Sequence, residues 1–494
     1  MSSPTPPSES TQIIDHHNRD HSFDLATCTY HGQVVKPEYL EQTPVRIGSD
    51  WIANRLLQGI KLELWELRDG VWIVVDRADN EGVVINSAQR DDLRQKPDPT
   101  SKRPPALSIT LEAQNFRALR RTNWTPSGVC VLVGPNGSGK STMLTLLEFF
   151  RGAYLRSPPS EIDHIGGVYG LRSWGAPEEE PVLVAFTVGD LRWEVRLTTQ
   201  GATLSERLEE RVTRKREVIL TRAALSQRLI YNNQERMIAG HDGRLAIRIV
   251  ADADNAEELT TLIHALTGIR VYRDYNLSSL QTNGSRHSGD LDLHPTGQNA
   301  FTVLRNWRDR RDLKPQYQFV VSRLRVAFPE VFADLDFHVA GLTVTVDLID
   351  PKAHQACPLA LAPAGWITGL LHLTAVAGAQ EGSLIAIDDF GNDLHPYAIR
   401  KLTEAFREWA EEHNLIVCLA SHSPVLLDEF KEEPDLVFVM EPGLEKRPVP
   451  LTELYETDWL SRFSLGRLYE HGEFGGQRHR DNGTTMGQRG QPVE

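Results

Sequence analysis

The segment at residues 134–141, with the sequence GPNGSGKS, constrains the fold more than any other part of the chain. It fits the pattern G-x-x-x-x-G-K-[ST], for which roughly 0.02 matches arise by chance in a chain of this length if glycine makes up about 7% of residues. Residues 131–133 before it are apolar, as in a buried strand, and Met143, Leu147 and Phe150 after it recur at helical spacing. The sequence therefore predicts a strand, a glycine-rich loop and a helix in succession.

A loop of this kind binds phosphate groups through its backbone. Its N–H groups and the helix N-terminus point at the phosphates, and Gly137 and Gly139 let the backbone wrap closely because they carry no Cβ. Lys140 places a positive charge on the transferred phosphoryl group, and Ser141 offers its hydroxyl to Mg²⁺. The residues predicted to contact the nucleotide are Gly134, Pro135, Asn136, Gly137, Ser138, Gly139, Lys140, Ser141 and Thr142. The alternative, a surface glycine turn, leaves the flanking strand and helix unexplained.

A second pattern is a short apolar run that ends in two carboxylates. Residues 384–387 read as a buried strand, and Asp388 and Asp389 follow directly. A carboxylate at the C-terminal tip of such a strand lies where α/β sheets bind ligands. We expect Asp388 to hold Mg²⁺ and Asp389 to orient or deprotonate the attacking water. An aspartate that merely caps a turn is the common alternative, but the upstream phosphate loop favours the catalytic interpretation.

A third pattern places a histidine at the end of the next predicted strand. The apolar residues 415–420 are followed by Ser421, His422 and Ser423. A lone histidine is more often structural than catalytic. Here it follows Asp388 by one strand–helix–strand unit, which would bring its imidazole to the neighbouring strand end beside the phosphates. From there His422 can hydrogen-bond the terminal phosphate and report its loss.

Composition limits the partners and the compartment. The chain of 494 residues has a formal charge of −14, which excludes a uniformly basic nucleic-acid coat but not a local basic groove. No run approaches the roughly 18 apolar residues of a membrane-spanning helix, and the polar start has no signal-peptide core. Four cysteines lie far apart, so we expect no disulfide framework and a cytoplasmic, reducing location.

The chain divides by composition into five parts. These are a disordered tail at 1–20, a small β-rich domain at 21–95, a Pro-rich linker at 96–106, a head at 107–476 with an insertion at about 151–356, and a disordered tail at 477–494. Hairpins are expected around Asp69-Gly70 and around Gly189-Asp190. Helices are expected within 202–230, 256–268 and 300–327. From residue 359 helices and strands alternate, which predicts a parallel α/β sheet.

Taken in this order, the motifs resemble the ABC-type ATPases of the RecF, SMC and OLD branch, and more closely the OLD-like predicted ATPases without a fused nuclease. The segments NFRALRR (115–121), GGVYGLR (166–172), HPTGQNAFTVL (294–304) and 459–476 are similar to that family as well. The resemblance covers about 107–476. It implies an α/β fold of the P-loop NTPase class, of ABC-ATPase head type, with a mixed sheet, an antiparallel β subdomain and a helical insertion.

The resemblance also implies a mechanism. Two heads would form a homodimer that sandwiches two ATP molecules with Mg²⁺, closing on ATP binding and opening on hydrolysis. The roles carried over are phosphate and Mg²⁺ ligands for Lys140 and Ser141, the Walker-B position for Asp388, the catalytic carboxylate for Asp389, the switch histidine for His422 and the dimer-facing loop for Asp393 and Leu394. Too few residues follow His422 for a fused nuclease domain, so a nuclease or toxin effector would act in trans.

The chain departs from the family pattern at three places. Asp389 stands where the family usually has glutamate, and its side chain is one methylene shorter, so hydrolysis is expected to be slow. The signature region around Gly365 lacks the serine that caps the partner's phosphate, because Pro363 and Ala364 occupy that stretch. The metal-sensing glutamine is not identified, and the candidates are Gln200, Gln227 and Gln234.

Weaker signals leave the partner open. Residues 205–222 carry charges of both signs and read as a solvated helix face, with a DNA-contacting arm as the alternative. Two arginine groups are candidates for one DNA-binding groove, namely Arg305, Arg308, Arg310 and Arg311 with Arg117, Arg120 and Arg121. The histidines near Cys28 fit no zinc pattern.

Three functions compete. The first is a Mg²⁺-dependent ATPase dimer that switches a partner protein or DNA complex in genome maintenance or in defence against foreign DNA. The second is an ATP-binding scaffold with little or no hydrolysis, which the residues at 389 and 363 favour. The third is a P-loop kinase or GTPase, which lacks support because the chain has no Asn-Lys-x-Asp motif.

Overall fold

The chain forms two compact units, residues 1–105 and 106–494, in this computed structural model. In the second unit the structure describes residues 108–177, 179–200, 203–224, 226–238, 243–253, 256–441 and 446–475. In the first it describes three strands. The predicted tails at 1–20 and 477–494, the linker at 96–106 and the histidines near Cys28 lie outside the described residues.

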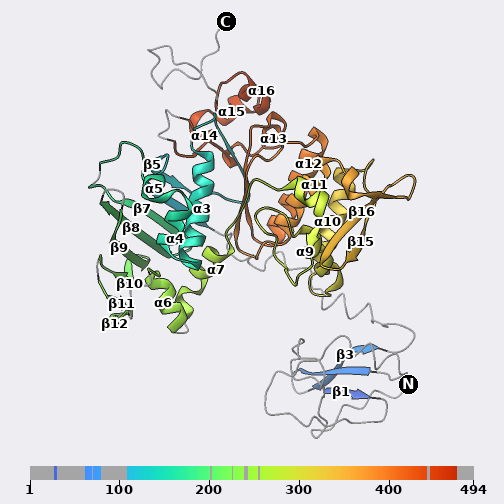
Figure 1. Cartoon of the computed structure of the whole chain (residues 1–494), viewed down its shortest axis with the longest axis horizontal. Coiled ribbons are helices and arrows are strands. Elements are labelled where there is room, and N and C mark those ends of the chain that lie inside the picture. The colour runs from blue at the N-terminus through green and yellow to red at the C-terminus, as the bar shows by residue number, and fades with distance from the viewer. Residues whose placement is uncertain are drawn as a thin grey trace. The chain divides into compact units, whose positions relative to one another are not determined.

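The described part of the first unit is an antiparallel sheet in the order β1-β2-β3 (Figure 1). Its strands are β1 (Thr27–Tyr30), β2 (Leu62–Arg68) and β3 (Val71–Ala78). Arg68 at the end of β2 pairs with Val71 at the start of β3, so the hairpin predicted around Asp69-Gly70 is confirmed.

A six-stranded sheet in the order β13-β18-β19-β6-β20-β21 runs through the middle of the second unit (Figure 1). Its strands are β6 (Val129–Val133), β13 (Arg270–Tyr272), β18 (Leu384–Ile387), β19 (Ile416–Ala420), β20 (Val437–Val439) and β21 (Val449–Pro450). The first five are parallel and β21 pairs antiparallel with β20. The parallel α/β sheet predicted from the helix–strand alternation is therefore confirmed.

Successive residues of these strands face two different hydrophobic cores. Val131 and Val133 lie in one core, whereas Cys130 and Leu132 lie in the other. The first core is filled from helices α9 (Ala300–Asp309), α10 (Lys314–Ala327), α11 (Ala364–Ala377) and α12 (Pro396–Glu412). The second is filled from α3 (Lys140–Leu155), α7 (Thr260–Gly268) and a second sheet. Covering on both faces explains why these strands are apolar at every position.

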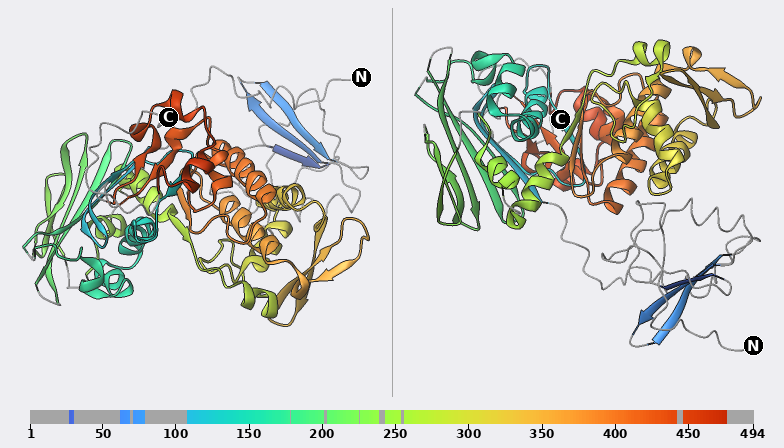
Figure 2. Two further views of the ribbon diagram at one scale, coloured as in Figure 1. Left: turned by 90° about the horizontal axis from the view of Figure 1, so that it is seen from above. Right: turned by 60° about the horizontal axis from the view of Figure 1, so that its bottom comes forward.

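The second sheet has eight antiparallel strands in the order β12-β11-β10-β9-β8-β7-β4-β5 among the described residues. They are β4 (Ile109–Phe116), β5 (Leu119–Trp124), β7 (Val182–Val188), β8 (Leu191–Gln200), β9 (Thr203–Arg214), β10 (Glu217–Arg222), β11 (Arg228–Tyr231) and β12 (Gln234–Met237). Figure 2 shows it as a green layer at one side of the head. Phe150 of α3 packs on it, with ring centroids 5.4 Å from Phe186 and 6.0 Å from Trp193. The strand pair predicted around Gly189-Asp190 is confirmed as β7 and β8.

The helix predicted within residues 202–230 is wrong, because this segment forms β9, β10 and β11. Leu208 and Val212 have the i, i+4 spacing of a helix, but they pair with Leu197 and Trp193 of β8. The turn between β9 and β10 is made by Lys215 and Arg216 with φ of 51° and 118°. Glycine and asparagine are the usual residues at positive φ, so this hairpin carries no turn signature in the sequence. The solvated helix face proposed for residues 205–222 is wrong for the same reason.

The remaining elements complete the helical side and the two ends of the head. A small sheet contains β14 (Ser285–Arg286), β15 (Asp334–Ala340), β16 (Thr343–Ile349) and β17 (Ala356–Pro358). The other α-helices of the described residues are α4 (Pro158–His164), α5 (Gly167–Leu171), α6 (Ala246–Ala253), α8 (Leu277–Asn283), α13 (Pro424–Asp428), α14 (Leu451–Leu454), α15 (Thr457–Leu460) and α16 (Leu465–Glu470). Short 3-10 helices cover Glu257–Leu259, Leu359–Leu361 and Pro434–Leu436.

These elements confirm the fold class. The head is an α/β fold with a phosphate-loop sheet, an antiparallel β subdomain and a helical part, and the helices expected within 256–268 and 300–327 are α7, α9 and α10. None of the helices in the described parts of the chain has the length and apolar character needed to cross a bilayer.

Candidate functional site

The loop between β6 and α3 takes the predicted place between a strand and a helix. Gly134, Gly137 and Gly139 have φ of 154°, 77° and 111°. A Cβ on Gly134 would lie 2.1 Å from the carbonyl oxygen of Met440, so only glycine fits where the loop passes β20. A Cβ on Gly137 would meet no atom within 4 Å, which leaves the space over the loop open.

Lys140 begins α3 and folds back over the loop. Its Nζ donates to the carbonyl oxygens of Gly134 at 2.7 Å and of Pro135 at 3.4 Å. Burial lowers the pKa of Lys140, while the carboxylates of Asp388 and Asp389 raise it. The lysine therefore lies within the electrostatic reach of both predicted carboxylates, as a phosphate-binding lysine beside a metal site should.

The other residues of the loop leave polar groups available. Asn136, Gly137 and Ser141 are exposed and Thr142 is half-buried. The Ser138 hydroxyl is buried and has no hydrogen-bond partner among the described residues. An unpartnered buried hydroxyl beside an open glycine turn fits a ligand with several acceptor oxygens. The residues present therefore fit the phosphates of a nucleotide.

Asp388 follows β18 at the same edge of the sheet as the loop. Its backbone N–H donates to the carbonyl oxygen of Tyr272 at 2.9 Å, and its Oδ1 accepts from the N–H of Asp389 at 3.2 Å. Burial raises the pKa of Asp388 and the charge of Asp389 raises it further, while Arg273 and Lys140 lower it. Two carboxylates held this close favour a cation between them and the loop.

Asp389 has a left-handed backbone, with φ of 50°. Its carbonyl oxygen accepts from the N–H of Asn392 at 3.1 Å, which closes the turn after β18. Aspartate and asparagine tolerate this conformation better than longer side chains do. The backbone of this turn thus gives a local reason for aspartate at the position where the resembled family has glutamate.

The predicted signature and dimer-facing segments touch each other within one chain. A Cβ on Gly365 would lie 2.4 Å from the carbonyl oxygen of Asp393, so Gly365 lets the first turn of α11 pack directly on that loop. Pro363, Ala364 and Asp393 are exposed, whereas Leu394 is buried. The N-terminus of α11 has no side-chain cap and is open to solvent.

His422 lies one strand over from Asp388, after β19. The Ser421 hydroxyl donates to the carbonyl oxygen of Phe390 at 2.5 Å, which ties the two strand ends together. Burial lowers the pKa of His422, Lys140 lowers it further, and Asp389 raises it. The imidazole therefore senses the charges of the loop lysine and of the acidic strand end, and the structure brings all three predicted patterns together.

Three residues that the sequence did not single out also reach this edge. Arg273 follows β13, whose Tyr272 pairs with Ile387 of β18, so its guanidinium lies level with Asp388 and pairs with Glu148 of α3. Tyr469 of α16 places its hydroxyl 2.9 Å from Nδ1 of His422. A Cβ on Gly475 would lie 3.6 Å from Cα of Gly134. The strand-like residues 270–272 are followed directly by Arg273 and Asp274, and this pattern was a usable sequence signal for Arg273.

Other sequence candidates are not brought to the site. Gln227 precedes β11 and Gln234 begins β12, and these two strands lie at the sheet edge opposite β5, while Gln200 is described only as the last residue of β8. The two arginine groups lie apart, because Arg117 and Arg120 belong to the β4–β5 hairpin while Arg305 and Arg308 belong to α9 on the other side of the six-stranded sheet (Figure 1). The structure does not combine them into one groove.

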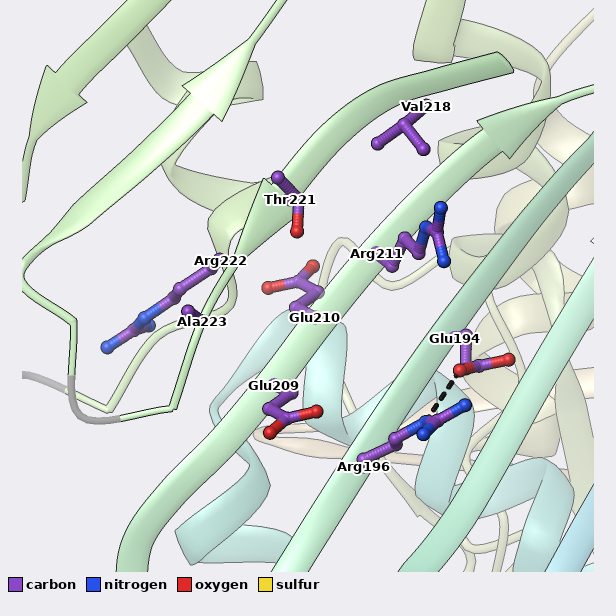
Figure 3. Close-up of a pocket in the computed structure, with 9 residues that line it drawn as sticks. All are labelled: Glu194, Arg196, Glu209, Glu210, Arg211, Val218, Thr221, Arg222 and Ala223. Carbon is purple, nitrogen blue, oxygen red and sulfur yellow. Dashed lines mark hydrogen bonds and ion pairs between the residues drawn. The ribbon is translucent and has the colours of Figure 1, made fainter. Parts of the chain in front are cut away.

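A hollow lies on the antiparallel sheet. It has a volume of about 440 Å³ and is lined by Glu194, Arg196, Glu209, Glu210, Arg211, Val218, Thr221, Arg222 and Ala223 (Figure 3). Glu194 pairs with Arg196 at 2.8 Å. Burial opposes ionisation of Glu194, but its bonds to Arg196 and Arg192 outweigh burial and lower its pKa. Since carboxylates and guanidinium groups neutralise each other here, this hollow lacks the uncompensated charge of the loop site.

Comparison with known proteins gives a family and a set of distant structures. Residues 129–428 match the family model AAA_21, described as "AAA domain, putative AbiEii toxin, Type IV TA system". The search of curated proteins finds no match. Among solved structures, the chain is similar to an SMC head bound to the C-terminal winged-helix domain of ScpA, with 11% identity over 66% of this chain and 92% of that one and a TM-score of 0.38. It is also similar to the SMC head domain from Thermotoga maritima, with 11% identity, the same coverages and a TM-score of 0.35.

Proposed function

Because the chain belongs to the AAA_21 family of AAA domains, we propose that it binds ATP at residues 134–142 and hydrolyses it with Mg²⁺. The observation that supports this most strongly is electrostatic. Lys140, Asp388, Asp389 and His422 come from three different segments, and their charges act on one another at one edge of the sheet. Groups of opposite sign collected beside an open phosphate loop suit phosphoryl transfer better than structural packing.

Each residue has a distinct part in this proposal. The loop N–H groups and Lys140 hold the phosphates and neutralise charge as it develops on the terminal one. Ser141 and Asp388 would hold Mg²⁺, which supplies further positive charge to the phosphate oxygens. Asp389 orients the attacking water and takes up its proton, and His422 donates a hydrogen bond to the terminal phosphate.

We further propose that two heads act as a homodimer of the OLD-like kind. The exposed, uncapped N-terminus of α11 and its contact with the loop at Asp393 support this, because such a helix end favours the phosphate of a facing molecule. The dimer would switch a partner in trans, a nuclease, a toxin or a DNA complex. The family description, which names a type IV toxin–antitoxin system, favours a role in defence.

The second candidate is an ATP-binding scaffold with little hydrolysis. Two observations favour it. Asp389 sits in a tight left-handed turn with a side chain shorter than glutamate, and residues 363 and 364 offer no hydroxyl to a facing phosphate. ATP would then hold two heads together without rapid turnover.

Phosphate release from ATP separates the two candidates. We expect wild-type protein with Mg²⁺ to release phosphate, and Lys140→Ala and Asp389→Asn to lose release by about 100-fold, since each removes a group that acts in the transition state. Release would be measured with and without DNA. ATP binding by wild type without release above the Lys140→Ala background would refute the enzyme and leave the scaffold.

A separate experiment tests whether two heads form a dimer. Asp389→Asn retains the phosphate loop and Asp388 and should therefore accumulate the ATP-bound state. Its mass in light scattering is expected to double on adding ATP and Mg²⁺, with Lys140→Ala as the control that stays unchanged. A monomeric Asp389→Asn protein saturated with ATP would contradict the head-to-head arrangement.

A further inference from the structure

The segment from Ser464 to Gly475 packs against the candidate site at several points. Tyr469 contacts His422, and a Cβ on Gly475 would lie 2.7 Å from the Tyr469 ring and 3.6 Å from Cα of Gly134. The N–H of Gly475 donates to Oε1 of Glu441, just beyond β20, at 2.6 Å. The end of this segment therefore lies on the phosphate loop and on the strand next to it. Figure 1 shows α13 to α16 gathered at one end of the head.

The position of Tyr469 is set by tight packing of α16 on α13, the helix that follows His422. Oδ1 of Asp428 at the end of α13 accepts from Ser464 Oγ at 2.7 Å and from the N–H of Gly466 at 2.9 Å. A Cβ on Gly466 would lie 2.4 Å from the carbonyl oxygen of Pro424, so glycine is needed for this approach. Both helices are thus fixed to each other within a few residues of the histidine and the tyrosine.

The phenol has one polar partner among the described residues, Nδ1 of His422 at 2.9 Å. Its ring packs on Phe474, with centroids 5.9 Å apart. Burial raises the pKa of Tyr469, so the hydroxyl stays protonated and can donate. A neutral imidazole carries one proton. If Nδ1 accepts from the phenol, the proton must reside on Nε2.

We propose that Tyr469 is a positioning residue that holds His422 in the Nε2–H tautomer, so that Nε2 presents a donor to the terminal phosphate of ATP. This inference rests on the proposed function, because it names what keeps the phosphate-sensing histidine in its working form. The opposite tautomer would present a lone pair to the phosphate oxygens and repel them. The hydrogen bond to Tyr469 selects against that state before the nucleotide binds.

The test uses the full chain and Tyr469→Phe, which keeps the ring and removes the hydroxyl. ¹⁵N spectra of histidine-labelled, nucleotide-free protein report the tautomer of His422, with His422→Gln used to assign its signal. Wild type is expected to show the Nε2–H form, and Tyr469→Phe a mixture of the two. The matched control is Tyr455→Phe, which removes a hydroxyl that donates to the carbonyl oxygen of Glu473 in the same segment at 2.5 Å.

Turnover supplies the second readout. Tyr469→Phe should lower kcat by about 2- to 10-fold, the range of one hydrogen bond, with a smaller change in KM and an unchanged melting temperature. If His422 keeps the Nε2–H tautomer in Tyr469→Phe, the inference is wrong. It is also wrong if the variant shows a mixture of tautomers but an unchanged kcat. If wild type releases no phosphate, the proposed function fails by itself, and the tautomer comparison still decides whether Tyr469 positions His422.

Discussion

The interior of the head holds a fully buried carboxylate, Glu210, whereas the strand-end edge holds a half-buried one, Asp388. Glu210 in β9 is fully buried and accepts hydrogen bonds from the Trp193 indole and from the backbone N–H groups of Ala246 and Ile247. Asp388 accepts one, from the adjacent backbone N–H of Asp389, among the described residues. Glu210 thereby completes the start of α6, whereas Asp388 keeps acceptor capacity for a ligand.

Two histidines, His372 in the interior and His422 at the strand-end edge, show the same contrast. His372 of α11 is enclosed between the rings of Tyr275 and Phe390, and burial lowers its pKa to about 3. His422 is exposed, and the charges of Lys140 and Asp389 act on it. The interior thus keeps its histidine neutral, while the edge places one among charges. The comparison shows that the carboxylate and the histidine of the candidate site differ from the interior pair in being accessible to solvent, and Asp388 also accepts fewer hydrogen bonds than Glu210.

The largest expected effect is a difference in phosphate release between variants of Asp388 and of Glu210. Asp388→Asn should lower phosphate release by about 100-fold or more, because it removes the charge that we propose holds Mg²⁺. Glu210→Gln has no route to the site and should leave the release per folded molecule unchanged. The measurement is phosphate release at saturating ATP and Mg²⁺. Equal losses of phosphate release in both variants would contradict a specific role for Asp388 at the candidate site.

The free energy of unfolding, in contrast to activity, should depend strongly on Glu210. Glu210→Ala leaves the Trp193 indole and two backbone N–H groups without an acceptor, and we expect the free energy of unfolding to fall by about 3 kcal/mol. Urea unfolding measures this. The exposed neighbour Glu209→Ala is the control and should stay within about 0.5 kcal/mol of wild type. A loss below about 1 kcal/mol for Glu210→Ala would mean that its three bonds are dispensable.

The smallest expected effect concerns the interior histidine and pH. Below pH 6.5 the unfolded chain protonates His372 while the folded chain, with a pKa of about 3, does not. The free energy of unfolding therefore falls as pH falls below 6.5, with a slope that approaches about 1.4 kcal/mol per pH unit, which amounts to about 1.6 kcal/mol between pH 6.5 and 5. The difference in unfolding free energy between wild type and His372→Gln should shrink by that amount. A difference that is constant with pH would contradict a neutral buried imidazole.

Most residues of the candidate site could be predicted from local sequence patterns. The phosphate loop, Asp388, Asp389 and His422 each stand directly after an apolar strand, and parallel strands bring their carboxyl ends to one edge. Arg273 and Tyr469 were missed because their places depend on which strand pairs with β18 and on the packing of α16 against α13. The residues next to Arg273 and Tyr469 in the sequence indicate neither this strand pairing nor this helix packing. The segment at 202–230 was wrongly predicted to be helical, because Lys215 and Arg216 form its β9–β10 turn and carry no hairpin signature.

The position of β6 between β19 and β20 has a consequence for the order in which the head can assemble. Residue 131 pairs with residues 419 and 437, and Gly475 completes the contact with the loop. During synthesis the phosphate loop therefore leaves the ribosome long before either of its neighbouring strands. Pairings this distant in the chain close late and slow the formation of the native sheet. A growing chain should thus be unable to complete the contacts around the phosphate loop until almost the whole head has been made.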